Sequence, residues 1–381
     1  MKLAVNTLVF CVAALLALGM VMLYSASVTD EVRHQQVGAH YLVAQLIWGA
    51  LGFLGCVAMT ALDYRTLKKN ALPLLAFAVL LLVLVLVPQI GRKINGARRW
   101  FDFHGVRFQP SEFGKLALIV FIAWYGEHFQ RQMGAFKKGI LIPGAVIGLV
   151  LGLTIIEPDY GSTMLLAAVS AVMLLLAGVR WKYFVPPVLL GLGGISLMIL
   201  RNPLRMKRIF SWLDLEQTKS GVGYQAYQAM LALGAGGWTG LGLGNGRQKL
   251  GFVPEHHTDF ILSIIGEELG LVATLAVIVA YAALVASGLY IAFHARDTFG
   301  LLLGSGLTFL IGLQALINIG VVTSMLPNKG LPLPFISYGG SNLLMLLAGV
   351  GVLLSIARQA HVSEPAVFVS DEAGENPFAS R

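Results

Sequence analysis

Residues 260–293 read FILSIIGEELGLVATLAVIVAYAALVASGLYIAF, an apolar run whose only charged side chains are Glu267 and Glu268. A helix needs about 20 mostly apolar residues to cross the hydrocarbon core of a bilayer, and this run exceeds that length. On a water-soluble protein the same run would expose a large apolar patch. It therefore predicts a membrane-spanning helix.

The composition of the whole chain agrees with this prediction. Of its 381 residues, 57% are hydrophobic and 12% are charged, whereas roughly a quarter of the residues in soluble domains are charged. A soluble globular enzyme is thereby excluded. The two cysteines, Cys11 and Cys56, both lie in apolar runs, so we expect neither a disulfide framework nor a cysteine metal site.

Nine further runs are long enough to span a membrane, some with snorkelling at their ends. The ten predicted spans are 5–24, 42–62, 72–88, 111–125, 140–156, 162–179, 183–200, 260–293, 299–323 and 341–356. Ser25-Ala26-Ser27 resembles a signal-peptidase site, but an uncleaved first helix fits a chain with nine more spans better.

These spans predict an all-α polytopic membrane protein with about ten transmembrane helices. A ten-helix membrane domain is expected over 1–360, including a large extracytoplasmic loop at 201–260 between helices seven and eight. The tail at 361–381 is polar, acidic and interrupted by prolines, so we expect a disordered cytoplasmic segment.

The loops that follow odd-numbered spans must share one side of the membrane, and they hold almost every polar feature of interest. The loops that follow even-numbered spans are short and dense in Lys and Arg. Because the positive-inside rule weights short loops, the even side and both termini are expected in the cytoplasm. The odd side, with the candidate active site, is then extracytoplasmic.

Cations gather on this odd side. Loop 89–110 carries five cations against Asp102 alone, and loop 201–259 carries seven against four acids. Arginine binds phosphate through a planar fork of donors, and lysine does so as a point charge. The loops therefore suggest phosphate binding, with anionic lipid headgroups as the alternative. The net charge of +8 forms no stripe of the kind that binds nucleic acid.

Charged residues at the edges of spans form further candidates. Glu112 and Lys115 are spaced i, i+3 and share a helix face, as a buried ion pair or as part of a site for a charged substrate. Glu157 and Asp159 form an acidic pair at a turn, where helix capping is an equal alternative.

The densest polar cluster, PEHHTDF at 254–260, ends at the loop–lipid junction with Asp259. A partly desolvated carboxylate there suits a general base for a hydroxyl, and an N-cap is the alternative. Glu267 and Glu268 need buried partners or a cavity. His256 and His257 are too close for an i, i+4 ligand pair, so no zinc is expected. Glycines at 240–246 match no nucleotide-binding spacing.

Four sequence motifs that occur in a fixed order along the chain contain most of these candidate residues. They are NGARRW (95–100) with FQPSE (108–112), EPDYGS (157–162), PEHHTDF (254–260) and PLPFISYGGS (332–341). The last contains prolines and glycines typical of a shaped re-entrant element. Together the motifs resemble the SEDS family, to which FtsW, RodA and SpoVE belong, over about residues 5–360.

The resemblance implies a peptidoglycan glycosyltransferase that polymerises lipid II into β-1,4 glycan strands and releases undecaprenyl pyrophosphate. The segments 243–245, 248–250, 314–315 and 327–330 favour the division branch of FtsW over the elongation branch of RodA. The resemblance also implies a class B penicillin-binding protein as crosslinking partner, together with divisome or elongasome proteins. Membrane lipid is a further partner, and no nucleic acid is expected.

The family's essential aspartate falls on Asp259, our candidate base. Arg98, Arg99 and Lys115 are the hypothetical pyrophosphate clamp, with Glu112 orienting Lys115. The remaining substrate-binding candidates are Trp100, which could stack on a sugar, Glu157 and Ser337. No organic cofactor is expected, and a divalent cation, Mg²⁺ or Mn²⁺, could share the phosphate role. Rival interpretations are a flippase for the same lipid and a non-catalytic scaffold for a cell-wall synthase.

Overall fold

The structure is a computed structural model that describes residues 1–34, 40–94, 96–103, 106–201, 203–221, 223–250 and 257–361. Two sequence expectations fall outside the described residues: the tail beyond His361, and the residues 254–256 that precede Asp259 in its motif.

Helices dominate the described part of the chain, as the sequence predicts. The α-helices are α1 (Lys2–His34), α2 (His40–Ala61), α3 (Arg65–Lys69), α4 (Ala71–Leu86), α5 (Pro110–His128), α6 (Ile142–Ile156), α7 (Tyr160–Leu176), α8 (Val185–Leu200), α9 (Pro203–Leu213), α10 (Tyr224–Ala235), α11 (Ile261–Phe293), α12 (Thr298–Val322) and α13 (Gly340–His361). Shorter helical turns are η1 (Gln130–Gln132), η2 (Lys137–Leu141), η3 (Trp181–Phe184) and η4 (Gln248–Leu250).

All ten predicted spans are helical over most of their length. Within the described residues, six helical stretches are long and apolar enough to cross a membrane: Lys2–Ser25, Leu42–Ala61, Lys137–Ile156, Ile261–Phe293, Thr298–Val322 and Gly340–Ala360. Helices α4 and α7 are apolar but shorter. The chain is a multi-pass membrane protein, and ten as the number of crossings stays a prediction.

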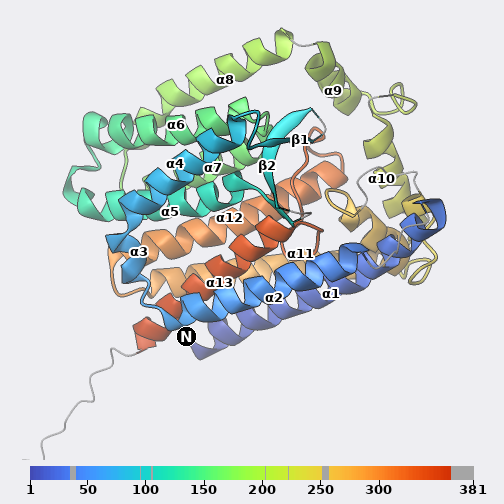
Figure 1. The fold of residues 1–381 in the computed structure, drawn as a ribbon, viewed down its shortest axis with the longest axis horizontal. Coiled ribbons are helices and arrows are strands. Elements are labelled where there is room, and N and C mark those ends of the chain that lie inside the picture. The colour runs from blue at the N-terminus through green and yellow to red at the C-terminus, as the bar shows by residue number, and fades with distance from the viewer. Residues whose placement is uncertain are drawn as a thin grey trace, which may run out of the picture.

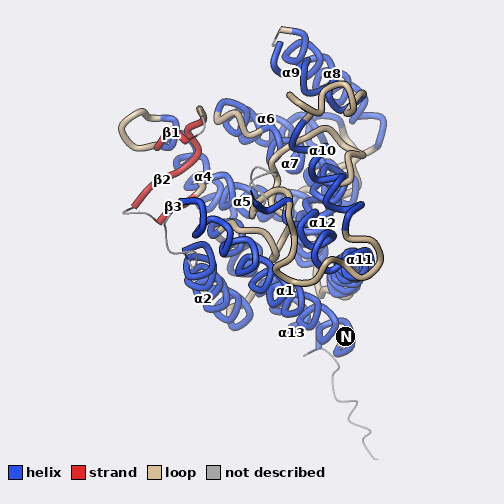
Figure 2. The backbone as a smooth tube through the Cα atoms, turned by 90° about the vertical axis from the view of Figure 1, so that its right-hand side faces the viewer, coloured by secondary structure: helices blue, strands red, loops and turns tan. Residues whose placement is uncertain are grey.

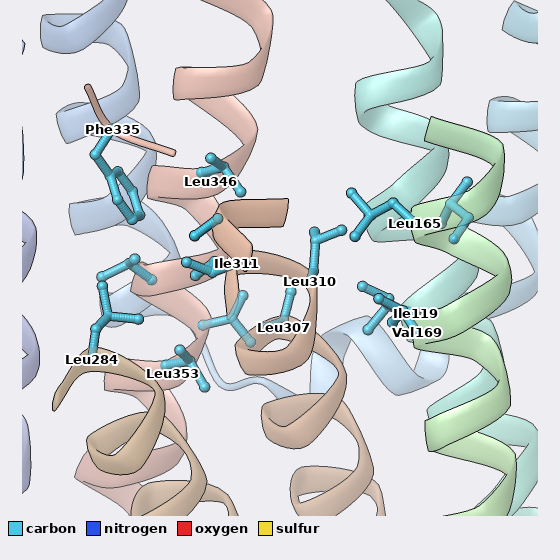
Figure 3. Packing of buried hydrophobic residues seen from close by; sticks show 14 of the residues in the cluster. Ile119, Leu165, Val169, Leu284, Leu307, Leu310, Ile311, Phe335, Leu346 and Leu353 are labelled. Carbon is cyan, nitrogen blue, oxygen red and sulfur yellow. The ribbon is translucent and has the colours of Figure 1, made fainter. Parts of the chain in front are cut away.

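Helix α12 forms the centre of the bundle. Its residues Leu307, Leu310 and Ile311 lie between side chains of α11 and α13 on one side and of α5 and α7 on the other (Figure 3). Lipid chains are as apolar as leucine, so these contacts stabilise the bundle through close packing rather than through removal from water.

Loop 89–110 contains a small sheet that the sequence analysis did not predict. Strands β1 (Arg92–Ile94), β2 (Ala97–Phe103) and β3 (Val106–Phe108) pair antiparallel in the order β1-β2-β3. Gly96 in the β1–β2 turn has φ of 83°, a conformation that favours glycine. The sheet lies at one end of the bundle, at the left edge of the view in Figure 2.

Contacts between loops confirm that odd and even loops gather at opposite ends. At the even end, Arg65 pairs with Asp297 at 3.0 Å and Lys68 with Glu127 at 2.6 Å. The N-terminus and the end of α13 lie at this end, near α3 (Figure 1). The odd end holds the sheet and α10 (Figures 1 and 2).

Two helices differ from their predicted form. Helix α1 continues to His34, ten positions beyond the expected boundary. Just past that boundary, Ser25 donates a buried hydrogen bond to Glu268 of α11. Helix α11 is kinked at Gly270, whose φ of 78° is not helical. A Cβ at Gly270 would lie 2.4 Å from the Gly240 nitrogen, so this close approach requires glycine.

Candidate functional site

Asp259 lies just before α11, at the odd end of the bundle. The N-cap residue of α11 is Phe260, whose side chain makes no capping hydrogen bond. Asp259 therefore does not hold the N-cap position that the sequence offered as its alternative. Its side chain is partly buried, and its backbone carbonyl accepts a hydrogen bond of 2.8 Å from Asn318 Nδ2 of α12. A rigid helix thus fixes the backbone that carries the candidate base.

The loop between α12 and α13 passes directly beside the Asp259 carboxylate. A Cβ built at Gly330 would lie only 2.6 Å from Asp259 Oδ2. Asn318 Nδ2 also donates to the Leu331 carbonyl at 2.7 Å, so one buried amide holds both segments. A Cβ at Gly161, in the first turn of α7, would lie 3.3 Å from the Gly330 carbonyl oxygen. Three segments therefore meet around Asp259.

Ser337 holds this loop in shape. Its hydroxyl donates to the Thr258 carbonyl at 2.6 Å and accepts from the Leu333 nitrogen at 2.7 Å. The side chain is buried, and α2 adds a further clamp, because Gln45 Nε2 donates to the Ser337 carbonyl at 3.1 Å. This geometry favours a positioning role for Ser337 over the direct substrate contact that the sequence suggested.

Lys329 is a cation in the loop that passes Asp259, and the sequence analysis did not name it as a site residue. It directly precedes Gly330, and its ammonium contacts Met164 Sδ of α7. Burial lowers the pKa of this lysine. The neighbouring Asn328 donates to Gln225 Oε1 of α10 at 3.1 Å. The sequence signal was present, since Lys329 is a cation within a loop rich in proline and glycine.

Glu112 and Lys115 form the ion pair that their spacing predicted. Lys115 Nζ lies 2.8 Å from Glu112 Oε1, and both side chains are buried. Asn342 of α13 donates to Glu112 Oε2 at 2.8 Å, and Gln314 of α12 donates to Asn342 Oδ1 at 3.3 Å. Lys115 Nζ makes no well-directed hydrogen bond within the described residues, so it keeps donor capacity beyond the ion pair.

Glu157 and Arg99 meet at the turn between α6 and α7. Arg99 Nε donates to the Glu157 carbonyl at 2.8 Å, and its Nη2 donates to the Pro158 carbonyl. The Glu157 carboxyl is fully buried, and neither oxygen accepts a hydrogen bond within the described residues. Burial and the charge of Asp159 raise the pKa of Glu157 to about 8, against a smaller lowering by Arg99.

Asp159 caps α7, which confirms the capping alternative for this residue. Its Oδ1 accepts from the Ser162 nitrogen at 3.1 Å, and its Oδ2 accepts from Gln109 Nε2 at 3.2 Å. Gln109 directly precedes α5, so this contact ties the Glu157–Asp159 turn to the helix that carries Glu112 and Lys115.

The strand β2 separates two members of the predicted clamp. Successive side chains on a strand point to opposite faces, so Arg98 and Arg99 do not share one. Arg98 lines a shallow groove of about 420 Å³ with Arg92, Lys93 and Asp102, while Arg99 reaches the Glu157 turn. Trp100 lies one residue further along β2 and is partly exposed. Arg98 and Arg99 therefore lie on opposite faces of β2, and Arg99 contacts the Glu157 turn whereas Lys115 pairs with Glu112.

Gly244 and the residues that follow it hold the two buried glutamates of α11. Gly244 N donates to Glu268 Oε2 at 3.0 Å, and Arg247 N donates to Glu267 Oε1 at 2.8 Å. Lys249 Nζ lies 2.6 Å from Glu268 Oε1. Both buried glutamates thus have the partners that their sequence context required.

Comparisons with known proteins agree with the four motifs. A family model for FtsW, RodA and SpoVE, described as cell cycle protein, matches residues 6–362. A Trichlorobacter lovleyi protein named probable peptidoglycan glycosyltransferase FtsW is 42% identical over 350 residues, 92% of each chain. A Coxiella burnetii protein of the same name is 37% identical and covers 92% of this chain and 95% of its own.

Solved structures share the fold. One similar structure is a chain of a peptidoglycan synthase complex that is described as coordinating polymerization and crosslinking. It has a TM-score of 0.76 and 30% sequence identity to this chain, and the match covers 93% of this chain and 97% of that chain. The rod shape determining protein RodA of Thermus thermophilus is similar with a TM-score of 0.68 and 29% identity, over 93% of this chain and 96% of its own.

Proposed function

Because the chain belongs to the family of FtsW, RodA and SpoVE cell cycle proteins, we propose that it is a peptidoglycan glycosyltransferase that serves cell division. The substrate is lipid II, and the product is a β-1,4 glycan strand. Relatives named FtsW at 42% and 40% identity support the division role. The observation that carries the proposal is the Asp259 carboxylate, held at the end of the bundle beside the backbone of Gly330.

The proposed reaction is an inverting displacement at C1 of an α-linked donor. Asp259 takes the proton of the acceptor 4-hydroxyl as that oxygen forms the new bond to C1. The bond from C1 to the pyrophosphate oxygen breaks, and undecaprenyl pyrophosphate leaves with the electron pair. Cations near the leaving group stabilise the charge that develops on it.

Arg98, Arg99 and Lys115 are proposed to supply that positive charge from different positions. Arg98 would act from the basic groove, and Lys115 from its pair with Glu112. Arg99 would have to exchange the two carbonyl groups that it now contacts for phosphate oxygens. Trp100 is proposed to stack on a sugar or to anchor β2 at the membrane interface.

A divalent cation, Mg²⁺ or Mn²⁺, could share the pyrophosphate charge. Within the described residues, no group of three or more His, Cys, Asp and Glu side chains could hold a metal ion. Magnesium is often bound by one or two carboxylates together with substrate phosphates. Glu157 does not fit that role as it lies in the structure, because its carboxyl is fully buried and its pKa is raised to about 8.

We further propose a penicillin-binding protein as partner, since the similar solved chain comes from a complex of polymerization and crosslinking. We also propose cytoplasmic termini and an extracytoplasmic active site in a bacterial inner membrane. The short cationic loops at the even end support this orientation.

The test is polymerisation of labelled lipid II by the purified protein, with and without a cognate class B penicillin-binding protein. Asp259→Asn is expected to lower turnover by about 10²–10⁴-fold, the usual contribution of a general base. Asp214→Asn is the matched control, because Asp214 is exposed in the same long loop and should polymerise normally. Unchanged product from Asp259→Asn would exclude this residue as the base.

Wild-type protein that makes no polymer with its partner would overturn the proposal as a whole. Lipid scrambling that persists in Asp259→Ala would then identify a flippase, and retained partner binding without either activity would identify a scaffold. For the clamp, Arg98→Ala should reduce turnover far more than it reduces thermal stability, and normal turnover would remove Arg98 from the mechanism.

A further inference from the structure

Helix α9 has a strongly two-sided sequence, PLRMKRIFSWL. At about 100° per residue, its register places Met206, Ile209, Phe210 and Leu213 on one side. The opposite side carries Leu204, Arg208 and Ser211, and its edges carry Arg205, Lys207 and Trp212. The helix therefore has an apolar side and a side that holds all its cations, and its eleven residues contain no acid.

Part of the apolar side of α9 is uncovered by the described protein. Phe210 is 58% exposed and Leu213 is 67% exposed, while Met206 and Ile209 are half-buried. On the polar side Lys207 is exposed, and Ser211 is 6% exposed. Trp212 Nε1 donates to the Ser324 carbonyl at 2.9 Å. A surface helix of a soluble protein shows the reverse arrangement, with its apolar side against the core.

The position of α9 indicates what covers this side. The preceding helix α8 exposes Leu189, Leu190 and Leu200 by 63%, 76% and 65%, as a lipid-facing span does. Helix α9 follows α8 after a short break and lies at the end of the bundle that holds the sheet and α10 (Figure 1). A helix that follows directly on a lipid-facing span lies where that span reaches the headgroups, so lipid is the occupant expected for its apolar side.

We propose that α9 is an interfacial helix that binds anionic phospholipid headgroups. Its apolar residues enter the upper acyl-chain region, and its cationic side, with Arg201 at the start, attracts the anionic groups. Through Trp212 the helix also anchors Ser324, the first residue of the loop that passes Asp259. The proposal concerns a lipid-binding surface and stands independently of the reaction at Asp259.

The test uses the full-length protein in nanodiscs, with both native cysteines replaced by alanine and one new cysteine carrying a fluorophore. Leu213→Cys reports on the apolar side of α9, and Glu216→Cys is the control, because Glu216 is exposed just beyond the helix. Lipids with a nitroxide on the upper acyl chain should quench the label at 213 and leave the label at 216 bright.

Headgroup preference is measured with the same nitroxide chain on phosphatidylglycerol or on phosphatidylcholine, at equal mole fraction. We expect phosphatidylglycerol to quench the 213 label at least about twofold more than phosphatidylcholine does, because each cation is attracted to an anionic surface. High salt should reduce this ratio. In the triple variant Arg205→Gln, Lys207→Gln, Arg208→Gln, both lipids should still quench the label, but the ratio of quenching by phosphatidylglycerol to quenching by phosphatidylcholine should be about one.

Quenching of the 213 label by aqueous iodide and not by lipid nitroxide would overturn the interfacial placement. Equal quenching by the two lipids in the wild-type helix would overturn the anionic preference. Protection of the 213 label only after addition of a penicillin-binding protein would show that a protein partner covers this side instead.

Discussion

The burial of Glu157 should make the stability of the folded protein depend on pH. Burial and the charge of Asp159 raise its pKa to about 8, so the folded protein holds a proton that the unfolded chain has already released. Stability should therefore fall as pH rises from the usual glutamate range through about 8. Glu157→Gln cannot ionise and should flatten this dependence.

The measurement is the thermal unfolding midpoint of both proteins at about pH 5 and about pH 9. Relative to wild type, the glutamine variant should gain about 3 °C or more at the higher pH, since about 1 kcal/mol moves the midpoint of a mid-sized domain by 2–4 °C. Asp214→Asn, at an exposed position, should leave the profile unchanged. Parallel profiles for Glu157→Gln and wild type would contradict the raised pKa.

Single residues of the site were predictable where a charge stands in apolar sequence. Asp259 and the Glu112–Lys115 pair are of this kind, because an ionisable group near a span needs a partner or a function. Asn318 and Gln45 were missed, although both are almost fully buried and hold the backbone around Asp259. Their signal was a neutral amide within an apolar helix, whose partners only the tertiary fold reveals.

At the scale of elements, the loop beside Asp259 gives a sharp prediction. Gly330→Ala would place a Cβ 2.6 Å from Asp259 Oδ2, so the carboxylate must move. We expect at least about a tenfold loss of polymerisation, because misplacement by about 1 Å can cost 10²-fold. Gly339→Ala in the same loop is the control, since its new Cβ would meet only the Asn342 Cβ, at 3.6 Å.

Both glycine variants should unfold at nearly the temperature of wild type, because the affected atom in Gly330→Ala is the end of a movable side chain. Equal turnover by the two variants would mean that the position of the Asp259 carboxylate does not depend on Gly330.

The buried cluster at the kink of α11 joins three elements. Lys249 Nζ contacts Glu268 Oε1 at 2.6 Å and Ser25 Oγ at 2.8 Å, so α1, η4 and α11 share one network. Lys249→Met leaves Glu268 buried without its cation and should cost about 3–5 kcal/mol. The double variant Lys249→Met, Glu268→Gln removes both charges and should be more stable than Lys249→Met alone. A double variant as unstable as the sum of the single variants would argue against direct coupling.

Elements with a strong apolar signal were predictable, and those set by long-range contacts were not. The run 299–323 corresponds to α12 (Thr298–Val322), because hydropathy alone specifies a spanning helix. The kink at Gly270 depends instead on the approach of Gly240, thirty positions earlier. The sheet at 92–108 pairs strands of three to seven residues, too short to give a periodic signal that stands out from a basic loop.

On the scale of the whole molecule, the two ends of the bundle have different chemistry. The even end is closed by exposed or half-exposed ion pairs such as Arg65–Asp297, which contribute about 0–1 kcal/mol each. The odd end brings together Asp259, the Glu157 turn and the basic groove along β2. A reaction that uses lipid-linked sugars must take place at the membrane surface, and the odd end is the one equipped for it.

This assignment predicts that the two ends face different compartments. In a background with Cys11 and Cys56 replaced by alanine, Gln217→Cys and Arg131→Cys introduce exposed thiols at the odd and even ends. Gln217→Cys should react with a membrane-impermeant maleimide in intact spheroplasts, because the positive-inside bias places the odd end outside. Arg131→Cys should react only after permeabilisation. The reverse pattern would place Asp259 in the cytoplasm, where newly flipped lipid II is not available, and would refute polymerisation at this end of the bundle.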